Sequence, residues 1–212
     1  MDVHPPHEPV HSWRDALIHI ALMTVGLFIA LMLEGVVEYV HHRELVNEAR
    51  ENIHRELEGN QKALQGDIAS VARAQNNVKA AVATLRFLKN HRDARGQSIG
   101  FAWTIGNLSD AAWSTARDTG ALGYMPYAEV QSDASVYQLQ AYVNTQILAL
   151  TTRQSEALAP IAMTQDGHLD TLSDTDFDRM IQNASVNAMD LLTVGQLMQG
   201  LDQSYKDALR RQ

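Results

Sequence analysis

The feature that most constrains this chain is an apolar run from Ala16 to Leu33, which reads ALIHIALMTVGLFIALML. Its 18 residues include one ionisable side chain, His19, and no proline. The hydrocarbon core of a bilayer is about 30 Å thick and takes about 20 helical residues to cross. Trp13 and Tyr39 flank the run and are about 39 Å apart along a helix, close to the thickness of a bilayer with its headgroups. The run therefore predicts a transmembrane helix.

A cleaved signal peptide has a different pattern. Arg14 is the only Lys or Arg before the run, so a basic leading region is missing, and the run is longer than the usual ~7–15 apolar residues. Glu34-Gly35-Val36 is a poor match to a small-x-small cleavage site. We therefore expect an uncleaved single-pass anchor. The predicted organisation is a flexible tail (1–12), a transmembrane helix with interfacial ends (13–40) and an extramembrane domain (41–212).

Composition excludes several classes of protein. The chain has 212 residues, and its extramembrane part is long enough for one domain with its own core. A net charge of −8 argues against a nucleic-acid partner. Cysteine is absent, which excludes disulfides, thiolate metal sites and cysteine nucleophiles. We find no nucleophile elbow, P-loop, nucleotide fingerprint or zincin motif, so we expect neither an enzyme nor a cofactor.

The apolar run leads into a long helix. Ser12 is a plausible N-cap with Asp15 three residues on, and no stop signal follows Leu33. Leu57, Leu64, Val71, Val78 and Leu85 recur every seven residues, and Ile53, Ile68 and Val82 add partial second positions. This seam fits either the inner stripe of an intramolecular bundle or a coiled coil between subunits. The helix is expected to end within residues 91–96, with breaks possible at Gly59 or Gly66.

Capping residues and prolines divide the remaining chain. They predict a short helix over residues 110–119, a long helix from Ser132 or Asp133 to Ala159, and a last helix from about Ser173 to Arg210. No segment alternates with period two. The predicted fold class is all-α, with the membrane helix continuing into an antiparallel bundle of three long helices and one or two short ones.

One face of the membrane helix carries small and ionisable side chains. At 100° per residue this face, which we call the docking face, comprises His19, Met23, Gly26, Ala30 and Glu34. Small residues four apart let a second helix approach closely, and an ionisable group at membrane depth favours a protein neighbour over lipid. The alternative is that His19 and Glu34 lie near the two interfaces and are solvated.

Two Glu-x-x-His motifs follow the membrane helix, ending at His41 and His54. Di-iron bundles use this spacing, but on two facing helices, whereas here both motifs lie on one predicted helix and are best explained as solvated charge. His4, His7 and His11 are interrupted by prolines, which leaves at most a weak, flexible metal site. We therefore predict no metal centre.

Seven of the 13 aromatic side chains lie between Phe101 and Tyr142. A ligand cleft in this region would use Trp103, Trp113, Tyr124 and Tyr127. Core packing beneath the connecting loops explains the same enrichment.

Two segments resemble a group of uncharacterised bacterial single-pass membrane proteins. The first runs from Trp13 to about residue 65, and the second is LSDAAWSTARDTGALGYMP. The shared elements are Trp13-Arg14-Asp15, Gly26 to Leu31, Glu34, Glu38, His41-His42-Arg43, Trp113 and Gly120. The resemblance implies the same architecture in the bacterial inner membrane, with a periplasmic bulk domain, and carries over no activity or site. Arg43, Arg50 and Arg55 against Arg14 alone weakly favour the opposite sidedness.

Two functions fit these observations. The first is a non-catalytic, membrane-anchored interaction protein, an accessory or assembly subunit of a membrane complex or homo-oligomer, with the bilayer and another membrane protein or its own copies as partners. The alternative is a sensor-like helical module that binds a small ligand in the aromatic region.

Overall fold

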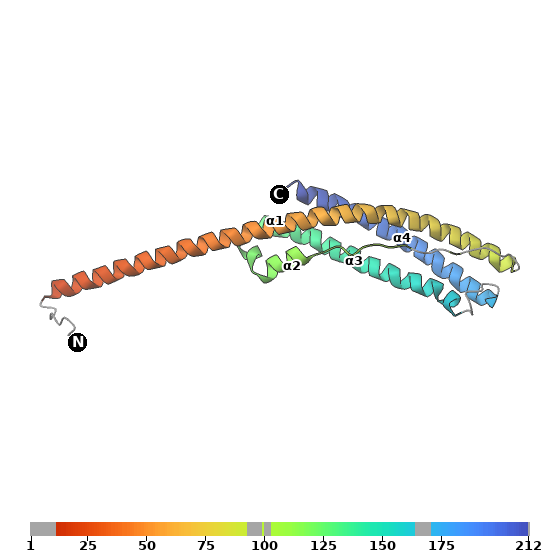
Figure 1. Cartoon of the computed structure of the whole chain (residues 1–212), viewed down its shortest axis with the longest axis horizontal. Coiled ribbons are helices and arrows are strands. Elements are labelled where there is room, and N and C mark those ends of the chain that lie inside the picture. Colours follow the sequence, from red (N-terminus) through yellow and green to blue (C-terminus); the bar gives the residue numbers. More distant parts are fainter. Residues whose placement is uncertain (1–11, 93–98, 100–102, 164–170, 212) are drawn as a thin grey trace, which may run out of the picture. The chain divides into compact units, whose positions relative to one another are not determined.

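The computed structural model describes residues 12–92, 99, 103–163 and 171–211, and the described residues form helices and no strands. The elements are α1 (Trp13–Asn90), α2 (Ala111–Asp118), the 3₁₀ turn η1 (Ala121–Tyr124), α3 (Tyr127–Ala162) and α4 (Asp174–Leu209) (Figure 1). The predicted all-helical class is confirmed. The chain divides into two compact units, residues 1–48 and 49–212, and α1 contributes to both.

Helix α1 begins where the sequence predicts. The backbone N–H of Arg14 donates to Ser12 Oγ at 3.2 Å, and the N–H groups of Asp15 and Ala16 donate to Ser12 O. Ser12 thus satisfies donors that a helix start leaves without partners. The helix passes Gly59 and Gly66 without a break and ends at Asn90, just before the predicted stop. The histidines at positions 4, 7 and 11 lie outside the described residues.

The seam of α1 is buried within the chain's own bundle, as the intramolecular alternative predicts. Leu57, Leu64, Val71, Val78 and Leu85 are each at most 2% exposed. Of the predicted second positions, Ile53 is fully buried, whereas Ile68 and Val82 are only half-buried, and Ala74, Ala81 and Leu88 are buried in their place. The second row therefore lies three residues after the first, as in a coiled-coil a/d pattern, and its alanines leave room for a neighbouring helix.

The boundaries of α3 differ from the prediction at both ends. The helix begins at Tyr127, directly after Pro126, and not at the predicted cap, Ser132 or Asp133. Asp133 is buried inside the helix instead of capping it. The helix also continues past Pro160 to Ala162. A proline so close to the carboxyl end removes one helical hydrogen bond without ending the last turn.

The start of α4 and the end of α2 follow local chemistry visible in the sequence. Ser173 Oγ accepts a hydrogen bond from the backbone N–H of Asp176, and the Asp176 carboxylate accepts from Ser173 N at 3.2 Å, a complete capping box. Hydrogen bonds from Ser173 hold the pKa of Asp176 below its ordinary value. Gly120, at φ 79°, occupies the left-handed conformation that follows α2.

Contacts between the helices have a consistent order along the chain. From α1 to α3 they pair Arg50 with Glu129, Glu56 with Tyr137, and Asn60 with Gln140, so both positions advance together. From α1 to α4 they pair Gln65 with Asp202, Gln75 with Leu191, and Lys89 with Asp178, so one position rises as the other falls. Within the second unit, α1, α3 and α4 lie alongside one another around the apolar core (Figure 1).

Asn187 interrupts the apolar core of α4. It is fully buried between the core positions Ala184 and Leu191, and neither atom of its side-chain amide has a hydrogen-bond partner among the described residues. An unsatisfied buried polar group costs about 1–3 kcal/mol. We expect Asn187→Leu to raise the free energy of unfolding by about that amount in a denaturant titration, while Gln182→Leu on the exposed face changes it by less than about 0.5 kcal/mol. Lower stability in Asn187→Leu would contradict this assignment.

Candidate functional site

The apolar run of α1 is exposed throughout the first unit. Among the described residues, α1 is the one helix long and apolar enough to cross a membrane, and none of its most apolar window is buried. The exposed fraction is 66% for Leu22 and 62% for Phe28. Trp13 and Tyr39, the flanking aromatic residues, are also exposed, at 72% and 66%. This segment is thus not a core helix of its own bundle.

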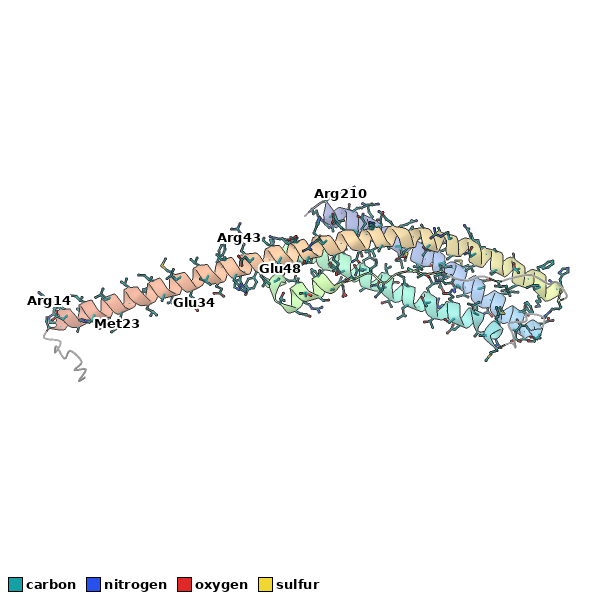
Figure 2. All side chains as sticks on the ribbon, viewed as in Figure 1. Arg14, Met23, Glu34, Arg43, Glu48 and Arg210 are labelled. Carbon is teal, nitrogen blue, oxygen red and sulfur yellow. The ribbon has the colours of Figure 1, made fainter. Side chains whose placement is uncertain are left out.

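The five residues of the predicted docking face lie on one continuous helix, α1. His19, Met23, Gly26, Ala30 and Glu34 are all exposed. Figure 2 shows the side chains of Met23 and Glu34 projecting away from α1. A Cβ built at Gly26 meets no atom within 4 Å. His19 Nδ1 lies 2.8 Å from Asp15 O, a contact that involves one ring nitrogen.

The Glu-x-x-His motifs do not assemble into a metal site. His42, next to the first motif, lies 3.9 Å from Glu38, and His54 of the second lies 3.4 Å from Glu58. Both pairs have i,i+4 spacing on α1. In the part of the chain that the structure describes, no three His, Cys, Asp or Glu residues are placed to hold a metal ion.

The four predicted ligand-region aromatics do not converge on one cleft. Trp113 stacks on Tyr137, with ring centroids 5.1 Å apart. Tyr124 and Tyr127 are 53% and 80% exposed. Trp103 is half-buried and lies beside a different part of α1, near Ala74. Core packing thus accounts for part of the aromatic enrichment, and Trp103 lines a pocket.

Residues 103–110, which we call the return segment, connect these two regions. Thr104 lines the same pocket as Ser70 of α1, the Gly106 N–H donates to the Asp67 carboxylate, and the Ala112 N–H donates to Glu56. The chain thus advances six positions from Gly106 to Ala112 while it passes 11 positions of α1, from Asp67 to Glu56, which is about 16 Å of helix. The return segment is therefore extended, and its backbone needs hydrogen-bond partners other than its own.

Two asparagine side chains supply those partners. Asn60 of α1 donates to Ser109 O at 2.7 Å and accepts from Ser109 N at 3.0 Å. Asn144 of α3 donates to Leu108 O at 3.0 Å and accepts from Leu108 N at 3.2 Å. Each side-chain amide therefore bonds both the N–H and the C=O of one backbone residue, as a neighbouring β-strand would. We call Asn60, Asn144 and Gln140 the amide clamp.

Gln140 completes the clamp inside the core. Its Nε2 donates to Ser109 O at 2.8 Å, and its Oε1 accepts from Asn60 and, at 2.6 Å, from the Tyr205 hydroxyl of α4. Gln140 is 1% exposed and Tyr205 is fully buried. All three long helices therefore meet the return segment through one satisfied polar network, which makes a wrong register costly.

Glu56 organises the neighbouring layer. Its carboxylate accepts from the Tyr137 hydroxyl at 2.9 Å, from the Ser109 hydroxyl at 2.8 Å, and from Ala112 N at 3.0 Å. The last bond places a negative charge at the amino end of α2, where it is favourable. Burial, followed by the hydrogen bond to Glu56, raises the pKa of Tyr137 above its ordinary value, and burial with the charge of Glu56 raises that of Tyr205. Both phenols stay protonated and act as donors.

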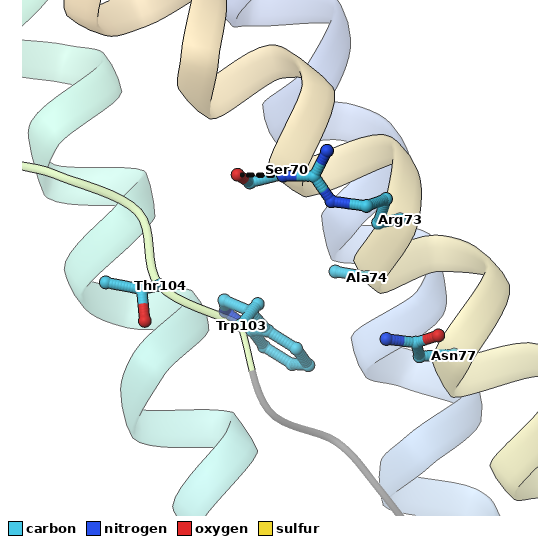
Figure 3. A pocket seen from close by; sticks show the side chains of 6 residues that line it. All are labelled: Ser70, Arg73, Ala74, Asn77, Trp103 and Thr104. Carbon is cyan, nitrogen blue, oxygen red and sulfur yellow. Dashed lines mark hydrogen bonds between the residues drawn. The ribbon is translucent and has the colours of Figure 1, made fainter.

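A pocket of about 350 Å³ opens between α1 and the return segment. We call it the Trp103 pocket; its lining residues are Ser70, Arg73, Ala74, Asn77, Trp103 and Thr104. Figure 3 shows the indole of Trp103 extending toward the face of α1 that carries Ala74 and Asn77. Arg73 Nη2 donates to Ser70 Oγ at 2.9 Å, so the guanidinium is held at one side of the pocket.

Sequence reasoning found Trp103 but neither its pocket partners nor the amide clamp. The sequence around the three clamp residues does not distinguish them from exposed polar residues on a helix. Asn60, Gln140 and Asn144 have a role because the return segment packs against them. The sequence held one signal: Asn60 lies seven residues after Ile53 and three after Leu57, so it falls on the buried side of the helix. Comparison of the chain with protein-family models, curated proteins and solved structures found no match.

Proposed function

We propose that this chain is a non-catalytic, membrane-anchored interaction protein, an accessory or assembly subunit of a complex in the bacterial inner membrane. The observation that carries the proposal is the exposed apolar run of α1, long enough to cross a bilayer and unburied by its own chain. Exposed apolar surface on this scale is unfavourable in water and favourable in lipid. No catalytic function is part of the proposal.

The bundle is the extramembrane part of the proposed protein. The order of the helix contacts supports an antiparallel arrangement of α4 against α1 and α3. The bulk domain is proposed to be periplasmic, on the resemblance to single-pass proteins described above. Proteolysis of intact spheroplasts tests this sidedness: cleavage of residues 49–212 supports a periplasmic domain, and full protection contradicts it.

Within the membrane, the docking face is the proposed contact with another copy or a second membrane protein. Gly26 and Ala30 let the backbone of a second helix approach that face closely. His19 and Glu34 are more favourable beside protein than in lipid. The partner chemistry is therefore another transmembrane helix with small residues.

A matched pair of alanines tests the contact. Ala30 lies on the docking face. At 100° per residue, Ala21 lies about 180° from Ala30, on the opposite side of the helix. We expect a photo-cross-linking residue at position 30, but not at position 21, to give a discrete adduct in native membranes. An adduct at both positions or at neither contradicts a specific docking face. The size and composition of the adduct identify a second copy or a different protein.

The ligand-binding alternative is supported by one specific observation, the Trp103 pocket. Tyr124 and Tyr127 are exposed and Trp113 stacks on Tyr137, so a ligand-binding function would use Trp103 and its neighbours on α1.

A further inference from the structure

The Trp103 pocket has the size of a small-molecule site and combines one aromatic ring with polar side chains. Its volume of about 350 Å³ is at the lower end of the range of ligand pockets. Ala74, 1% exposed, forms part of its floor, and a methyl group there leaves space that a larger side chain would fill. The indole of Trp103 supplies an aromatic face on the opposite side (Figure 3). A flat, one- or two-ring molecule suits this geometry.

Arg73 adds a positive charge to the rim of the pocket. Within the described part of the chain it has no carboxylate partner, and its contact is with Ser70 Oγ. Another guanidinium of the protein, that of Arg50, binds a carboxylate. Its Nε and Nη2 donate to the two carboxylate oxygens of Glu129 at 2.6 and 2.7 Å. The guanidinium of Arg73 can receive a carboxylate in the same two-point manner.

The other polar groups around the pocket do not occupy the guanidinium of Arg73, which leaves it open to an anion. The side chains of Asn77 and Thr104 make no hydrogen bond to any described residue. The nearest carboxylate on α1, Asp67, lies six residues before Arg73 and accepts the Gly106 N–H at 3.2 Å from each oxygen. Asp67 therefore faces the backbone of the return segment.

We propose that the Trp103 pocket binds a small aromatic carboxylate, with its ring against Trp103 and Ala74 and its carboxylate on Arg73. Stacking on the indole and the paired charge act at opposite ends of one ligand. Binding therefore requires both a ring and a carboxylate in the same molecule. This site goes beyond the proposed anchoring and interaction function and does not depend on it.

Calorimetric titration of the full-length protein in mild detergent tests the site. The probe is indole-3-carboxylate, and the two comparison ligands are indole, which lacks the carboxylate, and acetate, which lacks the ring. We expect saturable, millimolar or tighter binding of the probe and no saturable binding of either comparison ligand. Absence of binding by the probe, or equal binding by indole, overturns the proposal.

Two exposed arginines of α1 provide a matched control, since Arg73 and Arg86 both lack a carboxylate partner among the described residues. We expect Arg73→Gln to weaken binding by at least about tenfold and Arg86→Gln to leave it unchanged. Asn77→Asp, an exposed change that keeps the helix, is expected to weaken binding by charge repulsion. Equal affinity in wild type and Arg73→Gln, with circular dichroism showing an intact fold, overturns the assignment of Arg73.

Discussion

Replacing both Leu27 and Phe28 with arginine is expected to remove the protein from the membrane fraction. These residues lie near the centre of the segment between Trp13 and Tyr39, and both are at least 60% exposed. An arginine at the centre of a membrane helix costs about 2.5–3.5 kcal/mol, so the pair costs roughly 5–7 kcal/mol. We expect wild type to remain in the pellet after carbonate extraction of membranes and the double variant to appear in the supernatant.

The matched control places two arginines on the bundle instead. Leu148 of α3 and Met189 of α4 are 68% and 64% exposed, so Leu148→Arg with Met189→Arg adds the same charge to an already solvated surface. This control should stay with the membrane. Retention of the Leu27→Arg, Phe28→Arg variant in the carbonate-washed pellet would show that the apolar run does not anchor the chain.

The second large effect is expected in the amide clamp. Asn60→Ala removes the hydrogen bonds to both backbone groups of Ser109 and to Gln140 Oε1. Gln140 still reaches Ser109 O, but the Ser109 N–H loses its partner in a part-buried contact. With about 1–3 kcal/mol for each group left unsatisfied, plus a small cavity, we expect a loss of about 2–4 kcal/mol of unfolding free energy.

Urea unfolding followed by circular dichroism measures this loss. Asn76→Ala, on the exposed face of the same helix, is the matched control and should change the free energy of unfolding by less than about 0.5 kcal/mol. Similar values for the two variants would mean that the return segment is held by its apolar contacts, such as buried Leu108, and not by Asn60.

Local and periodic signals predicted the helical elements well. Ser12 and Ser173 start helices because a side-chain oxygen next to the first turn meets donors that every helix leaves open. The seven-residue repeat predicted the buried row from Leu57 to Leu85 because large apolar side chains mark it. Ala74 and Ala81 were missed because alanine is as common on exposed helix faces as at close helix contacts.

What sequence alone left undetermined depends on contacts between distant segments. Nothing local in residues 103–110 indicates that the return segment binds along α1. The predicted aromatic region separated into a stacked pair, exposed tyrosines and one pocket residue. Trp103 lines a pocket with Ala74, whereas Ala112, next to Trp113, bonds to Glu56, 18 residues earlier on α1. The docking face follows from helix periodicity alone, and its occupant stays a proposal.

The shared direction of α1 and α3 has a consequence for folding kinetics. Helices α3 and α4 are neighbours in sequence and pair through nearby contacts, such as Arg153 with Asp190. Contacts of α1 with α3 close much longer loops, as Asn60 does with Gln140 across 80 positions. Because distant loop closure slows folding, the α3–α4 pair should form before α1 docks. Mutations in the amide clamp should then act on the late, rate-limiting step.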